Sequence, residues 1–438
     1  MSTRATAGHP ARSRRVPTAD RHGGTLDKRQ AFLAAKVSAR RPVRSRACWH
    51  RRSSPRSIVR VASAAACSLP FVCDFLGSVL AQGVVEAFRL QAGFCAAFGS
   101  PLYAELLRRC ADDVERGGPV ACVLDGWTGN PVPDALVLRL MGAVHFLVLG
   151  GAAPELARFY PSVGGAPAFP GAWEAFVRVI ETHTETLRAA LDRHVQTNEV
   201  RRSAALLGGF LTIAASHRLA LRVLEIGSSA GLNLCWDRYR YEVVAASGKG
   251  QDSAVQPVWG DAESPVTIRT EWTGPLEVFG TDAVVAERGG CDVAPVDVSD
   301  AAQVRVLESF VWADQIARLQ QLRAAVALAR RSPPPLVRRR AADWLDEQLA
   351  TPCGGVTTVV FHSIMWWYLS EEERERVTAI IARAGGRASE RAPLAWLRLE
   401  LMTATDPDLL LTRWPGGDQV RLARADAHGR YVRWGARD

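Results

Sequence analysis

The chain has 438 residues, of which 48% are hydrophobic and 23% are charged. That length and apolar content can bury the cores of two or three domains, which excludes a wholly disordered protein. No run of eighteen uninterrupted apolar residues occurs, so we expect no transmembrane helix and no membrane partner.

The net charge of +9 is unevenly distributed along the chain. Sixteen Lys or Arg residues against Asp20 and Asp27 give residues 1–60 a net charge of +14, and the remainder carries −5. A folded domain that binds nucleic acid carries a basic patch of its own. We therefore expect no nucleic-acid partner beyond weak contacts made by the tail of residues 1–60.

Nine cysteines are scattered without any C-x-x-C pair or paired Cys/His spacing. This pattern predicts no metal site and is typical of reduced thiols in a cytoplasmic protein.

Residues 1–60 are rich in Arg, Ser and Pro, and too few of them are apolar to offset the entropy of ordering. The apolar stretch of residues 61–83 is interrupted by Pro70 and Asp74. We predict that residues 1–83 are a disordered basic N-terminal extension. A dispensable extension, a transit-type peptide and a nucleic-acid arm all remain open.

From residue 84 onwards apolar residues recur at helical spacing, as in Phe88, Ala92 and Cys95. Long helical patterns follow over residues 133–150 and 173–195. The sequence predicts an all-helical domain over residues 84–200.

After His217 the pattern of apolar residues changes, and short strand-like runs alternate with helical stretches. Residues 221–226 form an apolar run that ends in a glycine turn, and Ser370 with Glu373 forms a capping box that opens a helix. Further strands are expected at residues 283–287, 356–361 and 394–399, a β-rich insertion at about 236–283, and a hairpin from residues 409–412 and 419–422. This order predicts an α/β domain over residues 201–438, with a mostly parallel sheet and a C-terminal antiparallel hairpin.

The glycine turn Glu225-Ile-Gly-Ser-Ser-Ala-Gly231 is the sharpest motif. A strand followed by such a turn and a helix start lets backbone N–H groups approach a polar or anionic ligand. The motif resembles the first motif of class I S-adenosylmethionine-dependent methyltransferases, with Ser229 in place of the middle glycine. The resemblance implies a Rossmann-like methyltransferase fold and a cofactor, S-adenosylmethionine, bound by residues Glu225, Gly227, Ser229, Gly231 and Asn233. A glycine-rich turn without a ligand is the alternative.

Two later acids match the same family order. Asp292, in Gly290-Cys-Asp-Val-Ala-Pro295, resembles the acid after the second strand that bonds the ribose hydroxyls. It lies 67 residues after Glu225, whereas about 20 is usual for the ribose acid. Glu242, 17 residues after Glu225, is the rival at ordinary spacing. Asp343 resembles the residue near the adenine at the end of the third strand, or else caps a helix.

The segment from Val359 to Ser370 resembles the fourth-strand motif, after which substrate-side residues emerge. His362 is our candidate general base, and Trp366 and Tyr368 are candidate contacts for a small-molecule substrate. A buried structural histidine among core aromatics is the alternative.

The polar run Gln196-Thr-Asn-Glu199 precedes the helix that leads into the first strand. Asn198 and Glu199 are predicted to face the mouth of the cofactor site, although a helix cap would also explain them.

The same glycine turn reads G-x-S-x-G, the nucleophile elbow of α/β-hydrolases. Ser229 would then be the nucleophile, with Asp343 and either His362 or His428 as partners. The helical pattern before the turn is atypical of that fold.

Beyond these motifs, the stretch from residue 84 to the C-terminus resembles an uncharacterised bacterial family known as domain of unknown function 2332. The segments that carry the resemblance are residues 196–200, 224–234, 237–241, 311–315, 361–363 and 395–400. The resemblance implies no particular reaction. The sequence as a whole favours an S-adenosylmethionine-dependent methyltransferase of small molecules, with residues 84–200 as a substrate lid. A non-catalytic Rossmann-like metabolite-binding protein and a Ser229 hydrolase are the alternatives.

Overall fold

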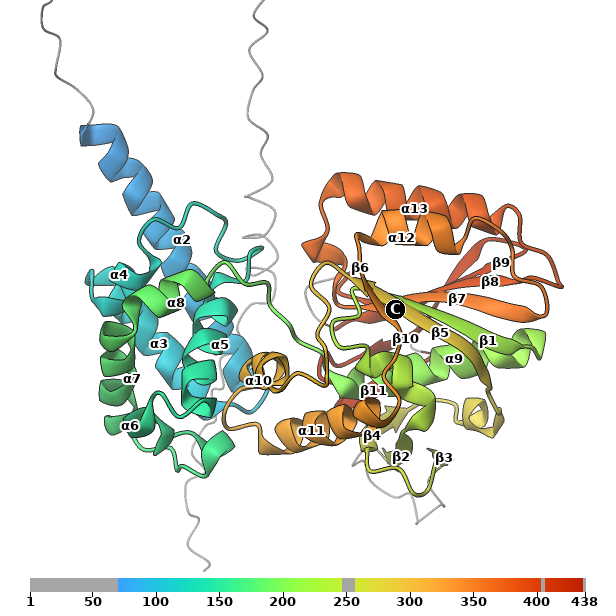
Figure 1. Cartoon of the computed structure of the whole chain (residues 1–438), viewed down its shortest axis with the longest axis horizontal. Coiled ribbons are helices and arrows are strands. Elements are labelled where there is room, and N and C mark those ends of the chain that lie inside the picture. The colour runs from blue at the N-terminus through green and yellow to red at the C-terminus, as the bar shows by residue number, and fades with distance from the viewer. Residues whose placement is uncertain (1–69, 246–256, 403–405, 436–438) are drawn as a thin grey trace, which may run out of the picture. The chain divides into compact units, whose positions relative to one another are not determined.

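The computed structural model describes residues 70–245, 257–402 and 406–435 (Figure 1). The predicted disorder of residues 1–69 and part of the expected insertion lie outside these ranges. Helix α2 (Pro70–Ala97) begins within the segment assigned to the extension, so residues 70–83 are helical instead. Among the described helices, none combines the length and the apolarity needed to cross a membrane.

The described residues before His217 contain helices and no strand. A proline occupies the first turn of α3, α4 and α6, where its missing N–H breaks no helical hydrogen bond. Helices α2 to α8 bury their apolar faces in one shared core, and α9 does not take part in it. The helices after α2 are α3 (Pro101–Glu115), α4 (Pro119–Leu124), α5 (Leu136–Leu149), α6 (Pro154–Ala157), α7 (Gly171–Thr182), α8 (Thr184–Ala190) and α9 (Ser203–His217).

The remainder forms an α/β domain around an eleven-stranded, mostly parallel sheet in the order β3-β2-β4-β11-β10-β9-β8-β7-β1-β5-β6. Its strands are β1 (Ala220–Ile226), β2 (Arg240–Ala245), β3 (Val258–Gly260), β4 (Thr267–Thr273), β5 (Val285–Asp292), β6 (Leu336–Arg338), β7 (Val356–Ser363), β8 (Leu394–Glu400), β9 (Asp408–Trp414), β10 (Asp418–Ala425) and β11 (Tyr431–Trp434). The helices between them are α10 (Ala301–Ser309), α11 (Ile316–Arg331), α12 (Ala341–Gln348) and α13 (Glu371–Gly385).

The strands β6-β5-β1-β7-β8 are parallel neighbours. The expected hairpin is β9 and β10, and it continues the sheet because β9 pairs antiparallel with β8. Strand β11, which was not predicted from the sequence, pairs with both β10 and β4. The strands of the 236–283 segment therefore extend the same sheet instead of forming a separate one.

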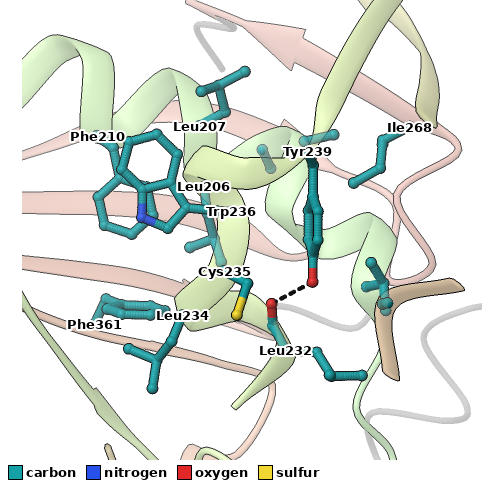
Figure 2. Packing of buried hydrophobic residues seen from close by; sticks show 14 of the residues in the cluster. Leu206, Leu207, Phe210, Leu232, Leu234, Cys235, Trp236, Tyr239, Ile268 and Phe361 are labelled. Atoms are coloured by element: carbon teal, nitrogen blue, oxygen red, sulfur yellow. Dashed lines mark hydrogen bonds between the residues drawn. The ribbon is translucent and has the colours of Figure 1, made fainter. Parts of the chain in front are cut away.

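Helices cover both faces of the sheet, because the strands in its middle are apolar on both sides. Leu221 and Val223 of β1 share a core with α9, whereas Leu224 and Ile226 share another with α12 and α13 (Figure 1). In the first core Phe210 of α9 stacks on Trp236 at a centroid distance of 4.3 Å (Figure 2). Helix α9 therefore belongs to the α/β domain.

The capping box that opens α13 is formed only in part. Ser370 Oγ accepts a hydrogen bond from Glu373 N at 3.2 Å, as expected. The Glu373 carboxylate turns instead to the Ala342 N–H of α12, at 3.0 Å, and to Arg340. Glu373 does not complete the capping box because its carboxylate is buried beside α12, where it accepts from an N–H at the start of that helix.

Asp314 joins the start of α3 to the segment before α11. Its carboxylate accepts hydrogen bonds from Ser100 Oγ at 2.5 Å and from Leu102 N at 3.0 Å. Gln315 donates to the carbonyls of Phe98 and Gly99. Asp314 therefore caps the start of α3 from a distant part of the chain, and Gln315 ties down the segment between α2 and α3.

His145 is a second polar link in the helical core. It is fully buried on α5, with Nδ1 3.1 Å from Ser309 O and Nε2 2.8 Å from Ser162 Oγ. Burial lowers the pKa of His145 to about 4.

We expect this histidine to make folding acid-sensitive. The unfolded chain takes up a proton near pH 6.5 and the folded one only near pH 4, so the stabilisation is complete above pH 6.5 and is lost as the pH falls towards 4. The loss amounts to about 3 kcal/mol. Urea unfolding at several pH values should show a shallower pH slope for His145→Gln than for His194→Gln, which changes an exposed histidine. Equal slopes would contradict this assignment.

Candidate functional site

The loops after β1 and β7 lie side by side at one edge of the sheet. The two strands are parallel neighbours, with Glu225 opposite Phe361. From β1 the parallel strands continue to β5 and β6 on one side, and from β7 to β8 on the other. Ligands of open α/β sheets bind at the carboxyl edge of such a switch point, which makes this edge the candidate site.

The glycine turn after β1 is tightly constrained. Gly227, Ser229 and Gly231 all have left-handed backbones, with φ of 66°, 52° and 67°. A Cβ on Gly227 would lie 2.7 Å from Met365 Cε, and one on Gly231 would lie 2.8 Å from Pro334 Cγ. The close approaches that require glycine here are thus to side chains of the protein itself.

The helix expected after the turn is a seven-residue 3₁₀ helix, η3 (Leu232–Arg238). Its apolar side chains pack under the sheet, and Tyr239 just beyond donates a hydrogen bond to Leu232 O at 2.6 Å (Figure 2). The Leu232 N–H is bonded to Asn198 Oδ1 at 3.0 Å. The turn therefore does not open a helix whose N-terminus could hold an anion.

Asp292, at the end of β5, lies beside the turn. Its carboxylate accepts hydrogen bonds from Ser229 N at 2.9 Å and from Ala294 N at 2.8 Å. The structure thus brings together the first two matched motifs across the long insertion.

The rival acid Glu242 is excluded by its position in the sheet. It lies on β2, seven strand spacings from β1, which is roughly 33 Å. There it pairs with Arg240 at 2.9 Å and with Arg269 at 2.7 Å. Both bonds lower the pKa of Glu242, and the bond from Arg240 has the larger effect.

Asp343 is likewise not at a strand end. It lies exposed on the first turn of α12 and pairs with Arg376 of α13 at 2.6 Å. The cap position of α12 is taken by Arg340, so Asp343 does not cap the helix either. The residues at the end of β6 are arginines, Arg338 and Arg339.

The polar run before α9 docks on the turn. Gln196 Oε1 accepts a hydrogen bond from Ser229 Oγ at 2.5 Å, and its Nε2 donates to Ala294 O. Asn198 binds the Leu232 N–H, and buried Glu199 pairs with Arg318 at 2.6 Å. The Ser229 hydroxyl thus donates to an amide, and no histidine in the described ranges forms a hydrogen bond with it.

His362 is fully buried at the end of β7, where it stacks on Trp366 at a centroid distance of 5.0 Å. Its Nδ1 lies 2.7 Å from Glu400 Oε1, which also accepts from Met365 N at 3.0 Å. A carboxylate at Nδ1 holds the tautomer that leaves a lone pair on Nε2. Glu400 was not among the residues predicted from the sequence, although an acid that ends the strand next to His362 was a usable signal.

The side chains after β7 divide by exposure. Trp366 packs on His362, whereas Trp367 and Tyr368 are 49% and 48% exposed. The exposed pair is the part of this loop that can meet a substrate.

Four buried polar atoms near the ends of β1 and β7 have no hydrogen-bond partner within the described part of the chain. They are Glu225 Oε2, Ser228 Oγ, Asn233 Oδ1 and His362 Nε2. Burial first, and the Asp292 charge second, raise the pKa of Glu225 well above its usual value, against the opposing effect of Arg202. Because buried polar groups are nearly always bonded to protein, water or a ligand, these atoms support the choice of this edge as the candidate site.

Comparison with known proteins assigns the chain to a family. A family model described as "Uncharacterized protein conserved in bacteria (DUF2332)" matches residues 85–434. The chain belongs to this family. The match covers both the helical part and the sheet, and ends at the last residue of β11. No curated protein and no solved structure matches the chain.

Two glycine variants can separate the cost of backbone strain from the cost of packing at this turn. Gly231→Ala must hold a left-handed alanine, which costs about 1–2 kcal/mol, and must also displace Pro334. Gly355→Ala is the matched control, because Gly355 has φ +82° with open space around it. We expect Gly231→Ala to lose at least 1 kcal/mol more in urea unfolding than the control. Equal losses would show that the turn can shift away from Pro334.

Proposed function

We propose that the chain binds S-adenosylmethionine at the carboxyl ends of β1 and β5 and transfers its methyl group to a small molecule. The observation that carries the proposal is Asp292, bonded to the glycine turn at the switch point of a parallel sheet. Numbered along the chain, β6-β5-β1-β7-β8 is the strand order 3-2-1-4-5 of a doubly wound nucleotide-binding sheet.

The residues present fit such a cofactor. A carboxylate has about four acceptor sites, and Asp292 uses two of them on backbone N–H groups, which leaves acceptors for ribose hydroxyls. Ser228 and Asn233 offer buried polar atoms that lack a partner among the described residues. Met365, which faces Gly227, is a flexible side chain that can yield space.

The bound cofactor supplies an electrophilic methyl group, and the chain supplies position and a base. The Asp292 carboxylate and the turn would hold the nucleoside, while Trp367 and Tyr368 would contact the methyl acceptor. His362 would accept the acceptor's proton at Nε2, since Glu400 holds its Nδ1–H and stabilises the imidazolium. Burial of this pair keeps water from the proton transfer.

The cofactor part of the proposal is tested by calorimetric titration of the full chain. We expect micromolar binding of S-adenosylmethionine and S-adenosylhomocysteine and none of NAD. Asp292→Ala should weaken that binding at least tenfold, because it removes the ribose acceptor and frees the Ser229 N–H.

The matched control is Asp343→Ala, which removes an exposed carboxylate on the outer helix layer and should leave the affinity unchanged. Absence of binding by a chain with a normal unfolding transition would overturn the proposal. Tight binding without formation of S-adenosylhomocysteine from any small-molecule mixture would favour a metabolite-binding protein instead.

A further inference from the structure

Arg202 is a buried cation whose partners are neutral. Only 8% of the residue is exposed, on the short 3₁₀ helix η2 (Val200–Arg202). Its Nε donates to Ala427 O and its Nη1 to Ser363 O, both at 3.1 Å. Within the described ranges no carboxylate lies within ion-pair distance of it. A buried guanidinium without a directly bonded carboxylate is costly, so its free donor capacity favours an anion.

Arg318, on α11, has a guanidinium nitrogen that forms no hydrogen bond with the described residues. It is 7% exposed, and its Nε and Nη2 both bind Glu199 Oε2, at 2.7 and 2.6 Å. Its Nη1 is buried without a partner in the part of the chain that the structure describes. The guanidinium lies over the Trp312 ring, 5.6 Å from the centroid, which fixes its plane.

His428 lies next to both arginines. Its ring contacts Trp312 edge-on at 5.3 Å, and the carbonyl that precedes it, that of Ala427, is the one that Arg202 binds. Burial holds the pKa of His428 well below its usual value, and so do the charges of Arg318, Arg202, Arg430 and Arg201. No hydrogen bond of the imidazole occurs with any described residue.

The carboxylates around this positive charge are bonded to other groups. Arg430 pairs with Asp426 at 2.8 Å and Arg318 with Glu199, whereas the hydrogen bonds of Arg202 to described residues go to backbone carbonyls. Glu199 and Glu400 are the carboxylates whose charges act most on Arg202, but Glu199 binds Arg318, and Glu400 is engaged by His362 and two backbone N–H groups. Ser363, which Arg202 holds, directly follows His362, so the cluster borders the edge at which we place the reaction.

We propose that Arg202, Arg318 and His428 form an anion-binding site for a small molecule that carries a carboxylate or a phosphate group. The two guanidinium groups offer planar donors in surroundings of low dielectric, where charge-assisted hydrogen bonds are strongest. His428 offers a neutral ring nitrogen as a further contact. The site does not depend on methyl transfer, although its position next to His362 suits the anionic group of an acceptor.

The test uses the full chain with inorganic phosphate and with acetate, in calorimetry and in thermal unfolding. Saturable binding, and a rise in Tm absent with chloride at equal ionic strength, are expected for at least one anion. Arg202→Gln should weaken binding at least tenfold, and Arg202→Lys should restore part of it because it restores the charge. Arg89→Gln is the control, because it removes an exposed arginine that pairs with Glu115.

Each result decides for or against the site. No saturable binding of either anion by the native chain overturns the proposal, as does equal affinity of Arg202→Gln and Arg89→Gln. If Arg202→Gln fails to fold, His428→Gln replaces it, with a loss of affinity again expected.

A repeat with saturating S-adenosylhomocysteine identifies the source of the anionic group. Unchanged phosphate affinity supports a separate acceptor, whereas competition supports the site and assigns it to the carboxylate of the cofactor. Phosphate binding without any binding of S-adenosylhomocysteine leaves the anion site standing and removes the proposed methyltransferase.

Discussion

The Asp292 carboxylate holds the candidate site together, because it bonds the glycine turn and its own turn at the same time. Ser229, whose N–H it accepts, donates its hydroxyl to Gln196, and Gln196 returns a hydrogen bond to Ala294 two residues after Asp292. Three segments far apart in the chain are thereby closed into one ring of hydrogen bonds. A left-handed backbone at Ser229 is maintained because these bonds fix the residue from both sides.

Around this ring the protein leaves polar groups buried and incompletely bonded. Glu225, His362 and Arg318 each contribute such an atom, and Arg202 adds a buried charge with neutral partners. Stability alone would favour apolar residues at these positions, since a buried group without a partner costs free energy. Glu225 and His362 lie near the ends of β1 and β7, Arg202 binds the last carbonyl of β7, and Arg318 lies on α11; these groups are the physical basis for both proposals.

The two proposals place different demands on the same edge of the sheet. The cofactor proposal uses the β1 and β5 side, where the carboxylate of Asp292 has acceptors left. The anion proposal uses the β7 side, where the donors of Arg202 and Arg318 exceed the available carboxylates. A ligand that is polar at one end and anionic at the other would meet complementary groups along this edge.

By itself, the sequence determined the elements whose signals are local. The strand at 221–226, the glycine turn, the capped helix after Ser370 and the hairpin around Pro415 all depend on neighbouring residues, so periodicity and turn chemistry identify them. The helical content before residue 217 and the resemblance to the family were visible for the same reason. The polar run at 196–199 was also recognised as a candidate.

Only the tertiary structure decided which distant residues meet. It paired Asp292 with the turn across an insertion, removed Glu242 to the far strands, and placed Asp343 on an outer helix. It also showed that the segment after Gly231 is a short 3₁₀ helix, whose Trp236 stacks on Phe210 of α9. Glu400, Arg202 and Arg318 gain their roles from strand order and helix packing. These bring together residues 38 positions apart for Glu400 and His362, and more than a hundred apart for the two arginines and their partners, so no local pattern in the sequence marks them.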